Sequence, residues 1–220
     1  MAFRAVLFDF GQTLFQAPDA AGVMVEAGVA PALAERLWQE IWARALTAEE
    51  LAKGRDLSEE AHRRHWLELL AAAEPHAPGI SARLYEAVMR IEAWIPFPDT
   101  ADVLAALDAA GVRVGIVSNT AMPLRAALDA HGLSAHVEAC IESYTLGIEK
   151  PDPRIFAAAC AALGCEPAET LMVGDSHLAD GAGVLGGLTV LLLPPVPRGA
   201  ARGLDAVLDL LQIRRPAPSQ

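Results

Sequence analysis

The chain is poor in cysteine and in long apolar runs. Its three cysteines, among 220 residues, are an odd number and form no CxxC pair. We therefore expect ordinary thiols in a reducing compartment rather than a disulfide framework. No apolar run reaches the roughly 18 residues that a membrane-spanning helix needs, and no charged, apolar and cleavage-site pattern marks a signal peptide. These absences predict a cytoplasmic protein without a membrane partner.

Positive charge is scarce as well. The formal net charge is -11, which disfavours nucleic acid as a partner because a polyanion requires clustered Lys and Arg. A small phosphorylated substrate stays compatible with this charge, since a local site can be positive on an acidic protein. Only two of the basic residues are lysines, Lys53 and Lys150. A compact ammonium thus stands at two positions in a chain that otherwise uses guanidinium.

Short apolar runs alternate with amphipathic helical patterns over most of the chain. This alternation predicts an α/β fold, a doubly wound parallel sheet with helices on both faces. At 53% hydrophobic residues the chain has ample material for such a core. Asp99 is expected to N-cap a helix at residues 100–110. The expected strands are residues 5–8, 112–117, 171–173 and 189–193, with a weaker one at 137–141.

One long region departs from this alternation. From residue 16 to residue 94 only helical patterns occur, which predicts an all-helical insert directly after the first strand. Pro96 and Pro98 mark the return to the sheet. We expect a core of residues 1–15 and 95–213, a mobile helical cap of residues 16–94 and a flexible tail of residues 214–220.

Polar side chains follow the expected strands at the points where the strands end. In open parallel sheets, ligands bind at the carboxyl ends of the strands. Carboxylates, a hydroxyl, an amide and an ammonium that converge there form a site for a hard cation and an oxyanion. Each residue alone is also a common turn former, helix residue or surface charge, so their shared position carries the prediction. The residues are Asp9, Ser118, Asn119, Lys150, Asp175 and Asp180.

The runs that contain these side chains resemble, in order, the four motifs of the haloacid dehalogenase-like (HAD) superfamily. The helical insert also lies where this superfamily places its smaller cap type. The resemblance covers nearly the whole chain and implies a Rossmann-like core and a Mg²⁺-dependent hydrolase, with a phosphatase as the expected activity. The four runs are FDFGQTL at 8–14, VSN at 117–119, EKPD at 149–152, and VGDS at 173–176 with Asp180.

The resemblance also implies a role for each position. Asp9 would be the nucleophile that attacks phosphorus and forms an aspartyl-phosphate. A carboxylate attacks a dianion only if the negative charge is neutralised, which Mg²⁺ and Lys150 would do. The implied metal ligands are Asp9, the main-chain carbonyl of Gly11, and Asp175, with Asp180 supporting them. The implied phosphoryl-binding residues are Ser118, Asn119 and Lys150.

One position departs from the pattern of the superfamily. Gly11 stands where HAD phosphatases usually have a second Asp that protonates the leaving group, and its neighbour Gln12 is an amide that does no acid–base work near pH 7. Losing such a group costs about 10²–10⁴-fold in rate. Three interpretations stay open: a phosphatase with an unusual acid or good leaving groups, a dehalogenase- or phosphonatase-type reaction, and a non-catalytic binding protein on a HAD scaffold.

Two pairs of large side chains at helical spacing are interpreted as ordinary helix residues. Trp38 and Trp42, four positions apart, are expected to pack inside the insert rather than to contact a substrate. His62 and His65 are expected on a solvent-facing helix surface.

Three further residues are weaker candidates for the site. His177 follows the last motif closely and is a candidate proton donor in place of the missing Asp. Lys53 and Arg55 follow an expected helix of the insert and are candidates for contact with an anionic substrate. The sequence identifies neither the substrate nor the oligomeric state.

Overall fold

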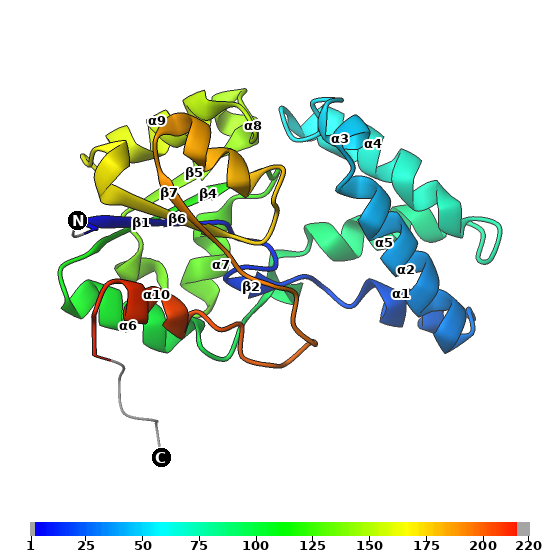
Figure 1. Ribbon diagram of the computed structural model, residues 1–220. Helices are drawn as coiled ribbons and strands as arrows, with labels where there is room; N and C mark the ends of the chain where they lie inside the picture. The colour runs from blue at the N-terminus through cyan, green and yellow to red at the C-terminus, as the bar shows by residue number, and fades with distance from the viewer. Residues whose placement is uncertain (1–2, 215–220) are drawn as a thin grey trace, which may run out of the picture.

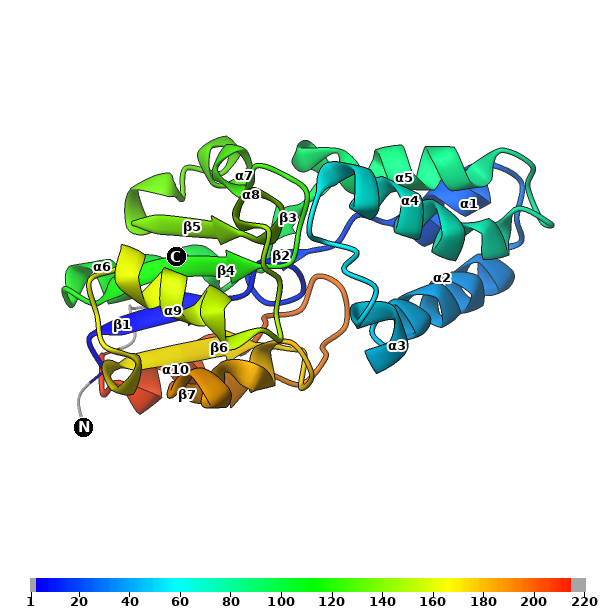
Figure 2. The same cartoon turned by 90° about the horizontal axis from the view of Figure 1, so that it is seen from above.

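A computed structural model describes residues 3–214, and its centre is a parallel sheet of five strands. The strand order is β5-β4-β1-β6-β7 (Figures 1 and 2). This architecture confirms the expected doubly wound, Rossmann-like core, and the weaker strand exists, shifted toward the C-terminus. The strands are β1 (Ala5–Phe8), β4 (Arg113–Ser118), β5 (Ala139–Glu142), β6 (Thr170–Gly174) and β7 (Thr189–Leu192).

Helices cover both faces of this sheet. The central strand β1 is buried along its whole length, as expected for a strand that is covered on two sides. Val6 and Phe8 pack with α6, α7 and α10, whereas Ala5 and Leu7 pack with α9 and the 3₁₀ helix η5. The bounds are α6 (Thr100–Ala109), α7 (Leu124–Ala130), α8 (Ser143–Leu146), α9 (Pro153–Ala162), η5 (Asp180–Gly186) and α10 (Asp205–Leu210).

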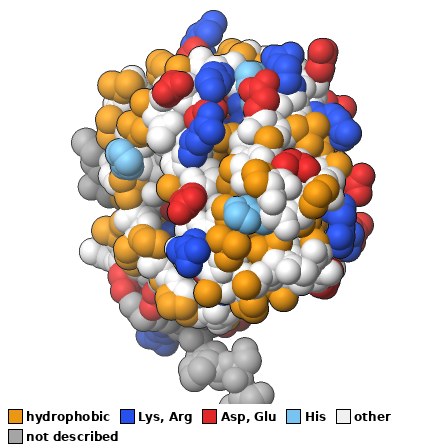
Figure 3. Space-filling view, turned by 90° about the vertical axis from the view of Figure 1, so that its right-hand side faces the viewer, with side chains coloured by type: hydrophobic (Ala, Val, Ile, Leu, Met, Phe, Trp, Pro, Cys, Tyr) orange, Lys and Arg blue, Asp and Glu red, His pale blue; other side chains and the backbone are white. Residues whose placement is uncertain are grey.

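Residues 17–94 contain only helices and turns, and we call this segment the helical insert. It has a hydrophobic cluster of its own, which includes Met24, Trp66 and Leu84. It lies beyond one end of the sheet (Figures 1 and 2), and its outer face carries intermixed charges of both signs (Figure 3). Its helices are α1 (Ala20–Glu26), α2 (Pro31–Ala45), α3 (Ala48–Leu51), α4 (Glu59–Leu70) and α5 (Ile80–Met89).

A two-stranded antiparallel ribbon joins the helical insert to the core. Its strands are β2 (Phe15–Gln16) and β3 (Ile95–Pro96). The sequence did not predict this ribbon, because two residues are too few to show an alternating pattern. Apart from residue 214, the expected flexible tail lies outside the described residues. Within residues 3–214, no helix combines the length and apolar character needed to cross a bilayer.

Asp99 begins helix α6 as predicted, but its carboxylate does not cap that helix. It accepts hydrogen bonds from the backbone N–H groups of Arg202, Gly203 and Leu204 at 2.8–2.9 Å. The neighbouring Thr100 hydroxyl donates to the Leu14 carbonyl at 2.8 Å. The start of α6 therefore fastens two distant segments, the one near the first motif and the one that leads into α10.

Replacing Asp99 with Ala should lower the free energy of unfolding by about 2 kcal/mol, because it leaves three backbone N–H groups without their acceptor. Urea denaturation would measure the change. Asp102→Ala, one turn along α6 at an exposed position, is the matched control and should change stability by less than about 0.5 kcal/mol. Equal losses in the two variants would contradict the assigned role.

Candidate active site

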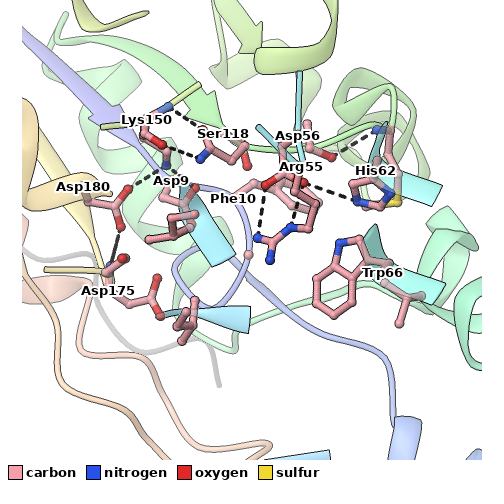
Figure 4. Close-up of a pocket in the computed structure, with 18 of the residues that line it drawn as sticks. Asp9, Phe10, Arg55, Asp56, His62, Trp66, Ser118, Lys150, Asp175 and Asp180 are labelled. Atoms are coloured by element: carbon pink, nitrogen blue, oxygen red, sulfur yellow. Dashed lines mark hydrogen bonds and ion pairs between the residues drawn. The ribbon is translucent and has the colours of Figure 1, made fainter. Parts of the chain in front are cut away.

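A pocket of about 130 Å³ lies between the carboxyl ends of strands β1, β4 and β6 and the helical insert. In Figure 4, Asp9, Lys150, Asp175 and Asp180 occupy one side, and side chains of the insert occupy the other. The topology explains the convergence, because the ends of neighbouring parallel strands meet at one edge of the sheet. All the residues expected at the site line this pocket: Asp9, Gly11, Ser118, Asn119, Lys150, Asp175 and Asp180.

The ammonium of Lys150 is the centre of the core side of the pocket. It is 2% exposed and donates to Asp9 Oδ1 at 2.7 Å, Asp180 Oδ1 at 2.6 Å and the Val117 carbonyl at 3.0 Å. These three bonds use all of its donors. Burial alone lowers the pKa of this ammonium, but Asp180 and Asp9 outweigh burial and raise the pKa above its usual value. Lys150 is therefore a fixed positive charge at the base of the pocket.

Asp180 orients the loop that follows β6. Its Oδ2 accepts from the backbone N–H groups of Asp175 at 3.0 Å and Ser176 at 2.9 Å, while Oδ1 accepts from Lys150. A Cβ atom at Gly174 would collide with this carboxylate, so only glycine permits the close approach. With both oxygens engaged, Asp180 holds its neighbours in place.

Three carboxylates could hold a metal ion together. Asp9, Asp175 and Asp180 each offer an oxygen, and these atoms all lie within 4.8 Å of one another. Burial raises the pKa of Asp9 to about 6 against the attraction of Lys150. Burial, with the charges of Asp9 and Asp180, raises the pKa of Asp175 to about 7. Crowded, desolvated carboxylates with raised pKa values favour a bound cation, and oxygen ligands suit a hard one such as Mg²⁺.

Asn119 and Ser118 differ in what they offer to a ligand. The Asn119 amide nitrogen donates to the Lys150 carbonyl at 2.8 Å, and its oxygen accepts from the Lys150 N–H at 2.7 Å. Asn119 therefore fixes the backbone of Lys150. Ser118 ends β4, and its hydroxyl makes no hydrogen bond to any described residue, which leaves it for a ligand in the pocket.

The glycine of the first motif faces an indole ring. A Cβ atom at Gly11 would lie 3.3 Å from the Trp94 ring, which is tighter than ordinary van der Waals contact. Trp94 is buried, stacks obliquely on Phe10 and donates its indole N–H to the Val88 carbonyl at 2.8 Å. The left-handed backbone conformation of this loop belongs to Gln12, with φ of 59°. An acidic side chain at position 11 would therefore require the Trp94 ring to shift by a few tenths of an ångström.

The insert side of the pocket holds an ion pair that the sequence did not predict. Arg55 is 6% exposed and donates to both carboxylate oxygens of Asp56, at 3.3 and 3.2 Å. Its guanidinium lies 4.9 Å from the centroid of the Trp66 ring. Arg55 does line the pocket, as expected of a substrate contact, but its charge is already balanced by its neighbour.

His62 also lines the pocket, which corrects its interpretation as a solvent-facing helix residue. Its Nδ1 lies 3.0 Å from the Tyr85 hydroxyl, and its Nε2 lies 3.7 Å from Asp56 Oδ1. Burial lowers the pKa of His62 to about 4, although Asp56 opposes the shift. The imidazole is therefore neutral near pH 7 and is not a ready acid.

Asp56 also connects the helical insert to the core through its backbone. Its N–H donates to Glu149 Oε2 at 2.8 Å, and its carbonyl accepts from the Ser143 hydroxyl at 2.6 Å. Glu149 directly precedes Lys150, and burial with the nearby Asp56 charge raises its pKa to about 7. This contact lies far along the chain from the β2–β3 ribbon and gives the insert a second attachment to the core.

Two of the weaker candidates do not line the pocket. Lys53 donates to Glu50 Oε1 at 2.9 Å within the insert. His177 is exposed on the loop after β6. Neither side chain is placed to contact a ligand held between Asp9 and Asp175.

Comparison with known proteins identifies a family. A model of the haloacid dehalogenase-like hydrolases matches residues 3–183. The chain is 39% identical to (S)-2-haloacid dehalogenase 4A of Burkholderia cepacia over 114 residues, which are 51% of this chain and 48% of that protein. The chain thus matches about half the length of this relative.

Other relatives have other activities. The chain is 30% identical to the glyceraldehyde 3-phosphate phosphatase of Methanopyrus kandleri over 185 residues, covering 78% of this chain and 75% of that protein. A crystal structure of a dehalogenase matches with a TM-score of 0.69 and 26% identity, covering 96% of this chain and 98% of the other. By their names, these proteins catalyse two different reactions.

The raised pKa of Asp175 predicts how stability depends on pH. In the metal-free protein, the Asp175 carboxyl group holds its proton more tightly when the chain is folded than when it is unfolded, where its pKa is near 3.8. The free energy of unfolding therefore falls as pH rises from about 4 to about 7. Asp175→Asn should remove the part of this fall that comes from Asp175, because the amide has no proton to lose. The melting temperature of the variant should therefore exceed that of the wild type by an amount that grows as the pH rises to about 7.

Thermal unfolding in EDTA and in Mg²⁺ would measure both effects of this substitution. Added Mg²⁺ should raise the melting temperature of the wild type by several degrees, since a ligand that binds the folded state stabilises it. The rise should be lost in Asp175→Asn and kept in Asp102→Asn. Equal stabilisation of all three proteins by Mg²⁺ would show that the metal binds elsewhere.

Proposed function

The chain belongs to the haloacid dehalogenase-like hydrolases, and from this premise we propose that it is a Mg²⁺-dependent phosphatase that acts on a small phosphorylated metabolite. The observation that supports this proposal best is the trio of Asp9, Asp175 and Asp180 around the buried Lys150. Oxygen ligands for a hard cation beside a fixed ammonium suit a phosphoryl dianion, whose charge must be neutralised before a carboxylate attacks it.

The donor atoms fit a Mg²⁺ ion. Asp9 and Asp175 would hold it together with the main-chain carbonyl of Gly11, while Asp180 supports them through its bonds to Lys150 and to the loop after β6. The bound ion would supply positive charge to the phosphoryl oxygens.

Asp9 is the proposed nucleophile. Lys150 binds Oδ1, so Oδ2 is left to attack phosphorus. A new oxygen–phosphorus bond forms as the bond to the leaving group breaks, and the leaving oxygen takes the electron pair. Water then hydrolyses the aspartyl-phosphate to release phosphate and restore Asp9. The Ser118 hydroxyl would donate to a phosphoryl oxygen, and Lys150 would contribute its charge.

The proposed substrate has a leaving group that needs little help from an acid. Position 11 has no side chain, His62 is neutral near pH 7, and Asp56 is paired with Arg55. An alkoxide requires a proton as it leaves, whereas a phenolate or carboxylate does not. We therefore infer a preference for aryl or acyl phosphates over alkyl phosphates.

A dehalogenase is the second candidate, because a dehalogenase is among the relatives and because a halide departs without a proton. Asp9 would then attack the carbon that bears the halogen, and halide would leave. The absence of an acid at position 11 costs this reaction nothing. The carboxylate trio favours the phosphatase, because a haloacid substrate requires no divalent cation.

We also propose that the helical insert is a mobile cap that admits substrate and excludes water when closed. Its separate hydrophobic cluster and its attachment through the short β2–β3 ribbon support this role. The contact between Asp56 and Glu149 would form when the cap closes.

One assay distinguishes the candidate reactions. Aryl, acyl and alkyl phosphates, and 2-chloropropionate, are each incubated with the protein in Mg²⁺ and in EDTA, while phosphate and halide release are measured. We expect phosphate release only with Mg²⁺, and its loss in Asp9→Asn, since an amide is a poor nucleophile. Halide release in EDTA would establish the dehalogenase instead. Absence of both products would favour a non-catalytic binding protein.

A second prediction concerns Gly11 and its contact with Trp94. Gly11→Asp combined with Trp94→Phe should raise kcat/KM for alkyl phosphates by about tenfold or more, since it restores part of the 10²–10⁴-fold effect of a general acid. The smaller ring gives the new side chain room, and Gly11 has no left-handed backbone conformation that would oppose it.

The matched control for this pair is Gly11→Asn with Trp94→Phe, which has the same shape but transfers no proton. Circular dichroism of both double variants would establish that they are folded before their kinetics are compared. Similar alkyl phosphatase activity in the Asp and Asn proteins would refute the assignment of the missing acid to position 11.

A further inference from the structure

Helix α2 has two apolar rows, and only one of them is buried in the insert. Ala34, Leu37, Ile41 and Ala45 form the buried row. Trp38, Trp42 and Leu46 form a second row at successive intervals of four residues, and all three are partly or well exposed. Trp38 and Trp42 pack partly against the hydrophobic cluster of the insert, and Trp38 also packs against that of the core, yet each keeps part of its ring accessible. Contiguous accessible apolar surface of this kind often marks a binding site.

The second row faces a hollow of about 420 Å³, which we call the outer hollow. Its opposite wall comes from the core, with Phe97 after the ribbon and Leu193, Pro195 and Val196 after β7. The outer hollow lies beside the catalytic pocket, and Trp42, Leu46 and Asp175 line both.

An aromatic wall runs through both spaces. The Trp38 and Trp42 ring centroids are 5.7 Å apart, and those of Trp42 and Trp66 are 6.0 Å apart. Trp38 lines the outer hollow, Trp42 lines both spaces, and Trp66 lines the catalytic pocket, where Figure 4 shows it opposite Asp175. A ligand held at Asp175, which lines both spaces, would have the rings of Trp42 and Trp38 beside it in the outer hollow.

The first motif spans the junction between the two spaces. Gly11 lines the catalytic pocket, and the next residue, Gln12, lines the outer hollow. Gln12 adopts φ of 59°, which is uncommon for a residue with a side chain, and its amide makes no hydrogen bond to any described residue. Arg202 holds the Gln12 carbonyl through Nε and the Leu193 carbonyl through Nη2. A buried cation thus fixes the backbone of this wall.

We propose that the outer hollow binds the organic part of the substrate and that this part is an extended aromatic group. The inference rests on the proposed function and specifies its substrate class: aryl phosphates larger than a single ring. Trp38, Trp42 and Phe97 are the large side chains of its mostly apolar lining, and the lining cation Arg202 is already bonded to backbone carbonyls. A sugar or triose would have only Gln12, Gln39 and Asp175 as further partners there, so part of its hydroxyls would be buried unpaired, which is costly. Trp38, Trp42 and Val196 are the residues that determine specificity.

The test compares phenyl phosphate with 2-naphthyl phosphate, whose leaving groups have nearly equal basicity but different apolar area. The wild type should show a kcat/KM for the naphthyl ester about tenfold higher, mainly through KM, as expected when a pocket accepts extra apolar groups. Trp38→Leu, which keeps an apolar side chain, and Val196→Phe, which narrows the outer hollow, should both reduce this ratio toward one. Leu185→Ala, at a residue 73% exposed on η5, is the control and should leave both rates unchanged.

A binding measurement separates this inference from the proposed reaction. Calorimetry with 2-naphthylmethylphosphonate and methylphosphonate, neither of which is hydrolysed, should show tighter binding of the naphthyl compound. Trp38→Leu and Val196→Phe should each remove that advantage. If the protein hydrolyses no phosphate ester but this binding pattern is observed, the inference about the outer hollow is supported and the proposed phosphatase activity is refuted. If phosphate esters are hydrolysed without any naphthyl preference, or the preference survives in both variants, the inference is overturned.

Discussion

A single buried ammonium makes the arrangement of the site possible. Asp9 follows β1 and Asp180 begins η5, far along the chain, and their carboxylates would repel one another without the charge of Lys150 between them. Removing one member of such a buried set leaves an unpaired charge, which typically costs about 3–5 kcal/mol. The Asn119 amide holds the Lys150 backbone by both its N–H and its carbonyl. The end of β4 therefore determines where this charge lies.

Much of the fold and of the core side of the site could be predicted from the sequence. Parallel strands covered on both faces produce short runs of apolar residues, and β1 is such a run. Because the sheet is parallel, side chains at the carboxyl ends of β1, β4 and β6 meet at one edge, which places Asp9, Ser118 and Asp175 together. These are local patterns combined with one topological rule.

The remaining features depend on partners that are distant in the sequence. Asp99 has the right position for a helix cap, but its carboxylate accepts hydrogen bonds from backbone N–H groups more than 100 residues away. Arg55 looked free to bind an anion, yet its adjacent Asp56 already neutralises it. Trp38 and Trp42 do pack against the cluster of the insert, as their spacing predicted, but that spacing did not show that a hollow faces the rest of each ring. The spacing of apolar residues identifies the apolar face of a helix, but it does not show which part of the protein that face contacts.

The two glycines at the pocket differ in how readily they can change during evolution. At Gly174, any larger residue meets the Asp180 carboxylate, which is bound to both the backbone and Lys150, so several residues would have to change together. At Gly11, only the ring of Trp94 opposes a side chain, and that ring belongs to a separate segment. A side chain at position 11 therefore requires a change at one contacting residue, whereas a side chain at position 174 would displace the carboxylate that orders the loop after β6.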